Sequence, residues 1–271
     1  DAGQCIQPRL KCSGKLTKCF SRHIRAATAS CEQPEIIERE CDPLTTFEPV
    51  SIDEVTAMIR KTPARSCSLD PIPSWFVKKY PAIFAPVLCR LCNLSLATGT
   101  LPKTLKCAIV RPRLKKPGLD PDAPQSYRPI SNLSYISKCV ERIVCRRFIS
   151  HADKHSLLPV RQSAYRRFHS TETAVLSVLN DLVRAVDSGH VTLLVMLDLS
   201  AAFDTVDHEI LLSVLQRRFS VTGGALDWFR SYLTDREQYF SYAGLDTSRS
   251  GLDCSVPQGS VLGPAKHLIH R

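Results

Sequence analysis

The feature that most constrains this chain is an apolar run at residues 191–197 that ends in an acid, Asp198. Apart from Thr192 the run is apolar, and it lacks the two-residue alternation of a half-exposed strand. Such a run favours a short strand that is buried on both faces. Small residues and Phe203 follow Asp198, and an amphipathic run occupies 209–219. The pattern predicts a buried strand, a tight corner and a helix, with a carboxylate at the mouth of the corner.

Three acids in this corner have two candidate roles. A carboxylate at the end of a buried strand is costly to desolvate unless a metal ion, a donor or a cation compensates it. The alternative is a turn or helix cap, for which aspartate is a preferred residue. Asp207 suits capping because the helical run begins directly after it, and Asp204 is assigned to the same use. Asp198 suits capping less well, since residues 199–202 separate it from any helix.

Five stretches carry motif-like sequence in a fixed order. They are CSLDPIPSWFVKK (67–79), SYRPISNLSYISKCVER (126–142), QSAYRRFHSTETAVL (162–176), LDLSAAFDTVDHEILL (197–212) and SVPQGSVLGP (255–264). In this order they resemble the N-terminal extension, motif 2, the block preceding motif A, motif A and motif B of the reverse transcriptases of LINE-type (non-LTR) retrotransposons. One match would be weak, whereas five in order are specific.

The resemblance implies an RNA-directed DNA polymerase that uses an RNA template, a DNA primer and deoxynucleoside triphosphates. This nucleotidyl transfer needs two divalent ions held by carboxylates. By resemblance Asp198 is the first metal ligand, and the main-chain carbonyl of Leu199 is an additional one. Hard oxygen ligands with room for water and phosphate select Mg²⁺, with Mn²⁺ as a substitute.

The resemblance also implies a nucleotide-binding set. Arg128 would contact the triphosphate, because its planar fork matches phosphate oxygens and stays charged. Lys115 and Lys116 would assist it. Phe203 stands where the family has the ring that blocks a ribose 2′-hydroxyl, and its alternative use is a core aromatic. The bases would lie beside two residues of the motif B stretch, Gln258 and Gly259.

Ser255 departs from the family pattern, because relatives commonly have glycine at this position. The departure concerns the turn that precedes Gln258 and Gly259.

The charge of the chain points to a polyanionic partner. The formal net charge is +10 and the pI is about 9.1, which favours nucleic acid over a membrane surface. The most basic stretch is 103–116, and a solvated strand edge is the alternative for it. Position in the resembled family favours template or phosphate contact for five arginines: Arg111, Arg113, Arg161, Arg166 and Arg167. His169, beside them, is interpreted as structural because no catalytic partner is fixed near it.

The cysteines and the hydropathy pattern indicate an intracellular protein without a membrane partner. The twelve cysteines are scattered through apolar, helix-like stretches and are interpreted as reduced. Cys89 and Cys92 form a lone CxxC, which is too little for a zinc site. No apolar run approaches the roughly 20 residues of a membrane helix, and the N-terminus lacks a secretory pattern.

Spacing and capping signals predict the remaining elements. A helix is expected to start at Ser51, and another over 75–97 is expected to be interrupted or bent at Pro81 and Pro86. Further helices are expected over 134–149, 170–189, 209–219 and 225–233. A strand is expected over 106–114, with an edge or bulge at Pro112, and a hairpin around Gly244. The arginine face of 134–149 is either solvated or lies along a phosphate backbone.

The fold class expected is α+β, a right-hand polymerase with fingers and an incomplete palm. Residues 1–49 are interpreted as a tail, 50–190 as fingers-like and 191–271 as a partial palm. After residue 264 the chain reads AKHLIHR and has no aromatic-X-Asp-Asp box, the family's second pair of catalytic carboxylates. Whether the chain is an enzyme is therefore left open, and we expect it to be inactive alone. The alternatives are a non-catalytic nucleic-acid-binding module and a pseudogene product.

Overall fold

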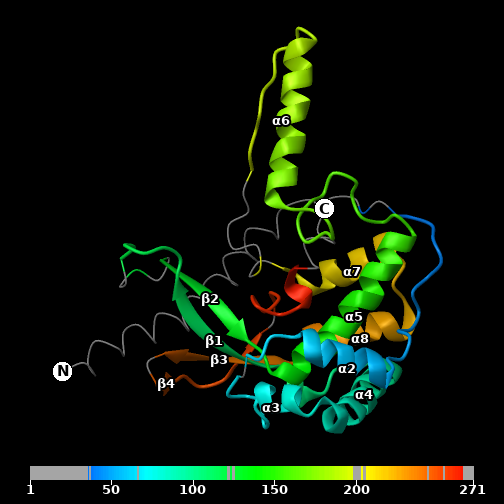
Figure 1. The fold of residues 1–271 in the computed structure, drawn as a ribbon, viewed down its shortest axis with the longest axis vertical. Helices are drawn as coiled ribbons and strands as arrows, with labels where there is room; N and C mark the ends of the chain where they lie inside the picture. Colours follow the sequence, from blue (N-terminus) through cyan, green and yellow to red (C-terminus); the bar gives the residue numbers. More distant parts are fainter. Residues whose placement is uncertain are drawn as a thin grey trace.

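The chain folds as a helical body joined to a mixed sheet. The computed structural model describes residues 36, 38–65, 67–120, 123, 126–197, 203, 206–242, 244–252 and 254–264. The helices are α2 (Ile52–Lys61), α3 (Ser74–Lys79), α4 (Pro81–Thr98), α5 (Tyr135–Lys154), α6 (Thr171–Asp187), α7 (His208–Phe219) and α8 (Gly223–Leu233). The strands are β1 (Cys107–Leu114), β2 (Tyr127–Asn132), β3 (Arg236–Tyr242), β4 (Leu245–Asp246) and β5 (Ser250–Leu252). This mixed arrangement of helices and strands confirms the α+β part of the fold class expected (Figure 1).

Local capping signals set where the helices begin and end. The Ser51 side chain accepts a hydrogen bond from the Glu54 amide and starts α2, and Ser134 does the same for α5. Ser170 and Thr173 form a reciprocal capping box at the start of α6. Gly99 ends α4 with a left-handed φ of 61°, a conformation that costs glycine little. These predicted boundaries are confirmed.

Helix α4 runs unbroken through Pro86, where the sequence predicted an interruption or a bend. Its 18 residues make it the one helix in the described parts of the chain that is long and apolar enough to cross a membrane. The expectation that no stretch approaches this length was therefore too strict. A core helix passes the same test, and α4 packs against α2 and α8 in the helical body. Its length and composition therefore say little about a membrane.

One hydrophobic core joins helices from both ends of the described chain. Trp228 of α8 is fully buried, and its Nε1 donates to Ser95 Oγ of α4 at 2.9 Å. The Phe148 ring of α5 lies 5.3 Å from the Phe219 ring of α7 and 5.8 Å from the Phe229 ring. Burial of large aromatic side chains is the main source of stability in such a core. Residues before 160 and after 205 thus share one core.

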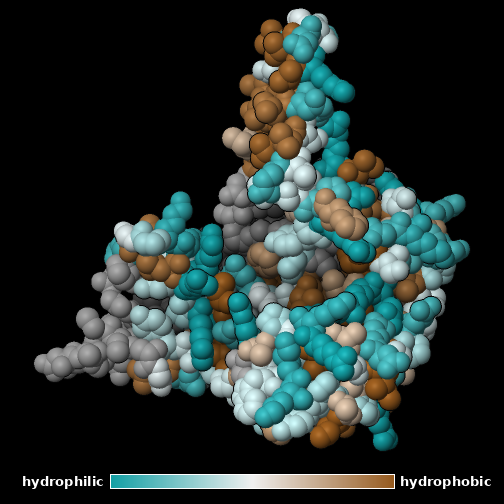
Figure 2. Space-filling model, in the orientation of Figure 1, coloured by the Kyte–Doolittle hydropathy of each residue, from teal (hydrophilic) through white to brown (hydrophobic). Residues whose placement is uncertain are grey.

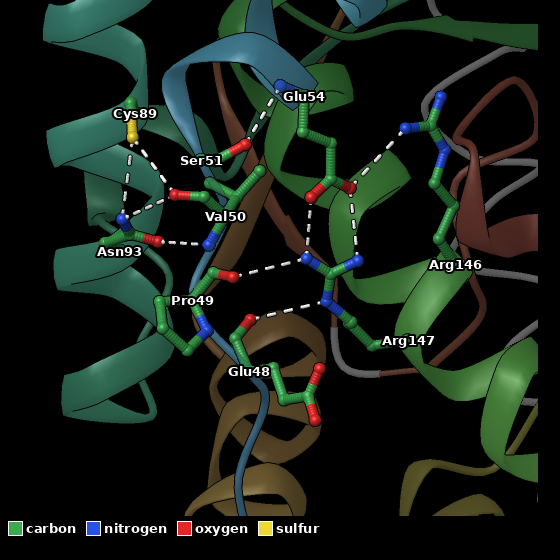
Figure 3. A network of polar contacts seen from close by, with 9 residues as sticks. All are labelled: Glu48, Pro49, Val50, Ser51, Glu54, Cys89, Asn93, Arg146 and Arg147. Carbon is green, nitrogen blue, oxygen red and sulfur yellow. Dashed lines mark hydrogen bonds and ion pairs between the residues drawn. The ribbon is translucent and has the colours of Figure 1, made fainter.

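A polar network ties the start of α2 to α5 (Figure 3). The Arg147 guanidinium donates to both carboxylate oxygens of Glu54, at 3.1 and 2.7 Å, and to the carbonyl oxygens of Glu48 and Pro49. Arg146 lies 3.6 Å from the same carboxylate. The question left open about this arginine face is answered in part, because Arg147 is engaged within the protein.

The sheet places β1 between two partners. Strand β1 pairs antiparallel with β2 through residues 109–114 and parallel with β3 through residues 107–110. Pro112 therefore lies where one side of β1 has no β3 partner, so its missing N–H costs no ladder bond on that side. Strand β3 also pairs antiparallel with β4 and β5, which confirms the hairpin expected around Gly244.

The expectation of a buried strand at residues 191–197 is wrong. These residues form no strand, and their large apolar side chains are 53% to 99% exposed. The helical spacing of the apolar residues in 170–189 predicts a buried side for this helix, yet α6 has no buried residue. The physical reason is that a strand of this kind is stable only between neighbours, and no described strand pairs with it.

Helix α6 projects away from the helical body in Figure 1, and Figure 2 shows apolar surface along it. The exposed apolar residues of α6 are Val175, Leu176, Val178, Leu179, Val183 and Val186.

Candidate functional site

Three stretches that are distant in sequence meet at the loop 255–264, which we call the junction loop. Its first residues bond to the corner that precedes α7. The Ser255 amide donates to the Val206 carbonyl oxygen at 2.9 Å, and the Val256 amide donates to the Phe203 carbonyl oxygen at 3.1 Å. The His208 Nε2 atom lies 2.8 Å from the Ser255 carbonyl oxygen. The two stretches that resemble motifs A and B are therefore held together by backbone hydrogen bonds.

The middle of the junction loop lies against β2. The Ser131 amide donates to the Gln258 carbonyl oxygen at 2.7 Å. Gly259 has a φ of 121°, and a Cβ atom placed there would lie 2.5 Å from the Ser131 carbonyl oxygen. Only glycine permits this approach of the two backbones. The sequence requirement for Gly259 is therefore a packing requirement as well as a conformational one.

Phe203 lies beside the same loop. A Cβ atom placed on Gly263 would lie 3.2 Å from the Phe203 Cε1 atom, so the ring packs against this glycine. The ring is half-buried. The structure thus brings together Phe203, Gln258 and Gly259, which the sequence analysis assigned to one nucleotide site.

The β1–β2 hairpin presents a cationic face next to this junction. Arg113 and Arg128 are direct partners across the antiparallel pair, and Arg111 lies two residues from Arg113 on the same face. The Arg111 and Arg128 side chains are exposed, and Arg113 is exposed as well. Like charges opposite one another destabilise a strand pair, and an anion bound between them would relieve the repulsion. Lys115 and Lys116 are exposed at the end of β1, where the Lys115 amide donates to the Ser126 carbonyl oxygen at 2.9 Å.

The arginines of the segment before α6 have partners within the chain. Arg161 forms an ion pair with Asp181 of α6. Arg166 Nη1 donates to the carbonyl oxygens of Pro159 and Val160, at 3.1 and 3.2 Å. The Arg167 guanidinium lies 4.6 Å from the Phe168 ring centre, a cation–π contact. None of the three lies on the β1–β2 hairpin.

Of the three aspartates predicted in the corner before α7, the structure describes only Asp207. The predicted metal ligands Asp198 and Leu199 lie outside the described residues, as does Asp204. Asp207 caps α7, because its Oδ1 accepts from the amides of Glu209 and Ile210 at 2.9 and 3.1 Å. The capping role expected for Asp207 is thus confirmed. Among the described residues, no group of three or more His, Cys, Asp or Glu side chains is arranged to hold a metal ion.

The CxxC cysteines serve the core. Burial raises the pKa of the Cys92 thiol to about 12, with Cys139 and Cys89 adding to the effect. The Cys89 thiol donates to the Val50 carbonyl oxygen at 3.2 Å (Figure 3). Zinc binds thiolates, so a site that disfavours the thiolate suits a structural role.

Glu141 is not among the site residues predicted from the sequence, and it is the one fully buried acid of the described chain. Its Oε2 atom accepts hydrogen bonds from the amides of Val261 and Leu262 in the junction loop, at 2.7 and 3.2 Å. A signal was present, because Glu141 lies three residues before Val144 and seven before Phe148, a spacing that puts the acid beside apolar residues on one side of the predicted helix. An acid at such a position must find donors elsewhere in the fold.

Comparison with known proteins places the chain in a family. Residues 114–269 match the family described as "Reverse transcriptase (RNA-dependent DNA polymerase)". The chain is 28% identical over 93% of its length to the "Probable RNA-directed DNA polymerase from transposon BS" of Drosophila melanogaster, and it covers 28% of that protein. It is 27% identical over 95% of its length to the "RNA-directed DNA polymerase from mobile element jockey" of the same organism, and it again covers 28% of that protein.

A third relative is the "Probable RNA-directed DNA polymerase from transposon X-element" of Drosophila melanogaster, with 29% identity over 84% of this chain and 25% of that protein. The chain thus spans about a quarter of the length of the relatives it matches. The resemblance inferred from the five stretches is confirmed. The chain therefore belongs to the reverse transcriptase (RNA-dependent DNA polymerase) family, as a domain related to the polymerases of non-LTR retrotransposons such as jockey.

Proposed function

We propose that this chain forms the part of a reverse transcriptase that holds the incoming deoxynucleotide and the template strand. The observation that carries the proposal is the junction loop, which is bonded to both the Phe203 corner and β2. A backbone held this closely on two sides is preorganised, and preorganisation is the main contribution a protein makes to phosphoryl transfer. The substrates proposed are an RNA template, a DNA primer and deoxynucleoside triphosphates.

The proposed roles follow the chemistry of each residue. The Asp198 carboxylate and the Leu199 carbonyl oxygen hold Mg²⁺, or Mn²⁺ in its place, as hard oxygen ligands do. When bound, such ions neutralise the triphosphate and lower the pKa of the primer hydroxyl. The planar Arg128 guanidinium donates bidentate hydrogen bonds to the triphosphate. The Phe203 ring excludes a ribose 2′-hydroxyl by volume.

The remaining groups bind along the substrate strands. Lys115 and Lys116 assist Arg128 as point charges, and Gln258 and Gly259 lie beside the base. Arg111 and Arg113 contact template phosphates from the β1–β2 hairpin. Arg161, Arg166 and Arg167 have a lesser share in this contact, because each already has a partner within the chain.

The salt dependence of nucleic-acid binding tests the hairpin face. Replacement of Arg111 and Arg113 by glutamine should reduce the slope of log affinity against log salt by about 0.7 to 0.9 for each phosphate that is no longer neutralised. Fluorescence anisotropy of a labelled RNA–DNA hybrid at several salt concentrations measures the slope. Arg217→Gln, an exposed arginine of α7, is the matched control and should leave the slope unchanged. A slope near zero for the unaltered chain would overturn the proposal.

Nucleotide selection tests the site itself. With template, primer and Mn²⁺ present, the chain should bind a deoxynucleoside triphosphate more tightly than the matching ribonucleotide. Phe203→Ala should narrow that difference by about tenfold, a value expected for a steric contact of roughly 1 to 3 kcal/mol. Asp198→Ala should remove the metal dependence of binding. Equal binding of the two sugars by the unaltered chain would contradict the role of Phe203.

We further propose that this 271-residue chain alone does not extend a primer. Its sequence contains no aromatic-X-Asp-Asp box, and one acid cannot organise two metal ions and a triphosphate. A primer-extension assay on an RNA template should give no product. Extension that disappears in Asp198→Ala would refute this inactivity and would show that another carboxylate completes the site.

A further inference from the structure

Glu141 is a buried acid whose partners come from three separate elements. It lies on α5 and is fully buried. Its Oε1 atom accepts from Ser137 Oγ at 3.3 Å, one turn earlier on α5. Its Oε2 atom accepts from the Tyr232 hydroxyl of α8 at 3.5 Å and from the amides of Val261 and Leu262 at 2.7 and 3.2 Å. Such a set of donors is what a buried carboxylate requires.

Burial raises the pKa of Glu141 above its ordinary value, and the nearby Arg236 guanidinium and the donated hydrogen bonds oppose this rise only in part. Arg236 is itself buried at the start of β3, where its Nη1 donates to the Tyr232 carbonyl oxygen at 2.9 Å. The two amide bonds join the Glu141 carboxyl group of α5 to the junction loop.

These bonds complete the anchoring of the junction loop. Its start is bonded to the Phe203 corner through Ser255 and Val256, and its middle is bonded to β2 through Gln258. Its end is bonded to Glu141, 120 residues away in sequence. Gln258 and Gly259 lie between the first and third anchors. Loss of the third anchor would free the backbone on one side of both residues.

We propose that Glu141 is a positioning residue, which sets where the junction loop presents Gln258 and Gly259 to the nucleotide. The inference rests on the proposed function, because it assumes that these two residues lie beside a nucleotide. It goes beyond that function by assigning the geometry of the loop to a residue that touches no substrate. A purely structural residue would lower stability without changing nucleotide affinity.

The test compares Glu141→Gln with Glu54→Gln. Both glutamates join α5 to another segment through a carboxylate, but the Glu54 carboxylate bonds to Arg147, outside the junction loop. Hydrogen exchange of the 255–264 peptide should rise by about tenfold in Glu141→Gln and remain unchanged in Glu54→Gln. The dissociation constant of the deoxynucleoside triphosphate should rise by about tenfold in Glu141→Gln only, while the salt slope of hybrid binding stays the same.

A second variant tests the same anchor in case Glu141→Gln does not fold. Val261→Pro keeps the carboxyl group and removes one of its donors, directly before the helical turn that begins at Leu262. It should weaken nucleotide binding in the same direction. Nucleotide binding that both variants leave unchanged would overturn the inference about Glu141 alone. Failure of the unaltered chain to bind any nucleotide would overturn the proposed function, and the role of Glu141 with it.

Discussion

At the scale of single residues, Ser255 explains why a glycine is favoured at the start of the junction loop. Its φ is 82°, in the left-handed region, and yet its amide bonds to Val206. A residue with a side chain adopts this conformation at a cost of about 1 to 2 kcal/mol, which glycine avoids. Part of that gain is offset because glycine is more flexible in the unfolded chain. The protein thus accommodates serine at this position, where the family commonly has glycine, at the cost of backbone strain.

Ser255→Gly should therefore stabilise the chain by about 1 kcal/mol, the strain relieved less the added entropy of the unfolded state. Urea unfolding followed by circular dichroism measures the change. Ser248→Gly, at an exposed position without a positive φ, is the control and should be neutral or slightly destabilising. A loss of stability in Ser255→Gly would show that the hydroxyl contributes more than the strain costs.

His151 gives the chain a dependence on pH. Burial lowers the pKa of His151, and His155 and Lys154 add to the effect, while the hydrogen bond with Phe219 and the charge of Asp42 oppose it. The ring nitrogen Nε2 lies 2.8 Å from the Phe219 carbonyl oxygen. Because the folded-state pKa is below the ordinary value of 6.5, the unfolded state takes up the proton first as the pH falls. Stability is therefore present above pH 6.5 and decreases as the pH falls from there toward the folded-state pKa.

His151→Gln should remove part of the stability loss below pH 6.5, since glutamine can donate to the same carbonyl without titrating. Thermal unfolding at a series of pH values measures this. His169→Gln, at an exposed position, should retain the full dependence. An unchanged pH profile in His151→Gln would assign the loss to the carboxylates instead.

At the scale of elements, six large apolar side chains of α6 and six of the 191–197 segment are exposed. Exposed contiguous apolar surface of this kind promotes association. Replacement of Leu176 and Val183 by lysine should lower concentration-dependent association at micromolar protein. It should change stability by no more than about 0.5 kcal/mol, because neither side chain is packed.

Sedimentation velocity and binding of a hydrophobic dye measure the effect of the Leu176 and Val183 substitutions. Ser177→Lys combined with Asn180→Lys adds the same two charges at exposed polar positions of α6 and is the matched control. Equal loss of association in the control would assign the effect to net charge rather than to apolar surface.

At the scale of the whole molecule, the structure separates what local sequence determines from what it does not. Helix ends at Ser51, Ser134 and Gly99 were predictable, because caps act within one turn. The strand expected at 191–197 was wrong, because burial depends on neighbours from distant segments. Glu141 was missed for the same reason, since its amide partners lie 120 and 121 residues away.

Part of the candidate site could likewise be predicted from the sequence, and part could not. The resemblance supplied Phe203, Gln258 and Gly259, and the structure shows them around one loop. No local sequence pattern predicted that Gln258 and Gly259 would contact Ser131 of β2. The assignment of Asp198 to the metal ions rests on the resemblance alone, because Asp198 lies outside the described residues.

The shared core makes a prediction about the intact molecule. The large apolar side chains of 191–197 are 53% to 99% exposed, whereas helices on both sides of this segment pack into one cluster. Phe47 and Trp228, from opposite sides, have ring centres 6.2 Å apart. Limited chymotrypsin digestion should therefore cut first within 191–197, where exposed leucine and methionine side chains are available.

The two fragments should then stay together on gel filtration under native conditions and separate only in denaturant, because the aromatic contacts across the core do not depend on the cut segment. Trypsin is a matched control, since no lysine or arginine lies between Arg184 and Arg217 and it cannot make this cut. A first chymotryptic cut within 51–148, or fragments that separate without denaturant, would mean that the segments before and after 191–197 fold as independent units. The junction loop would then lack the rigid support from α5 and β2 on which the nucleotide site proposed here depends.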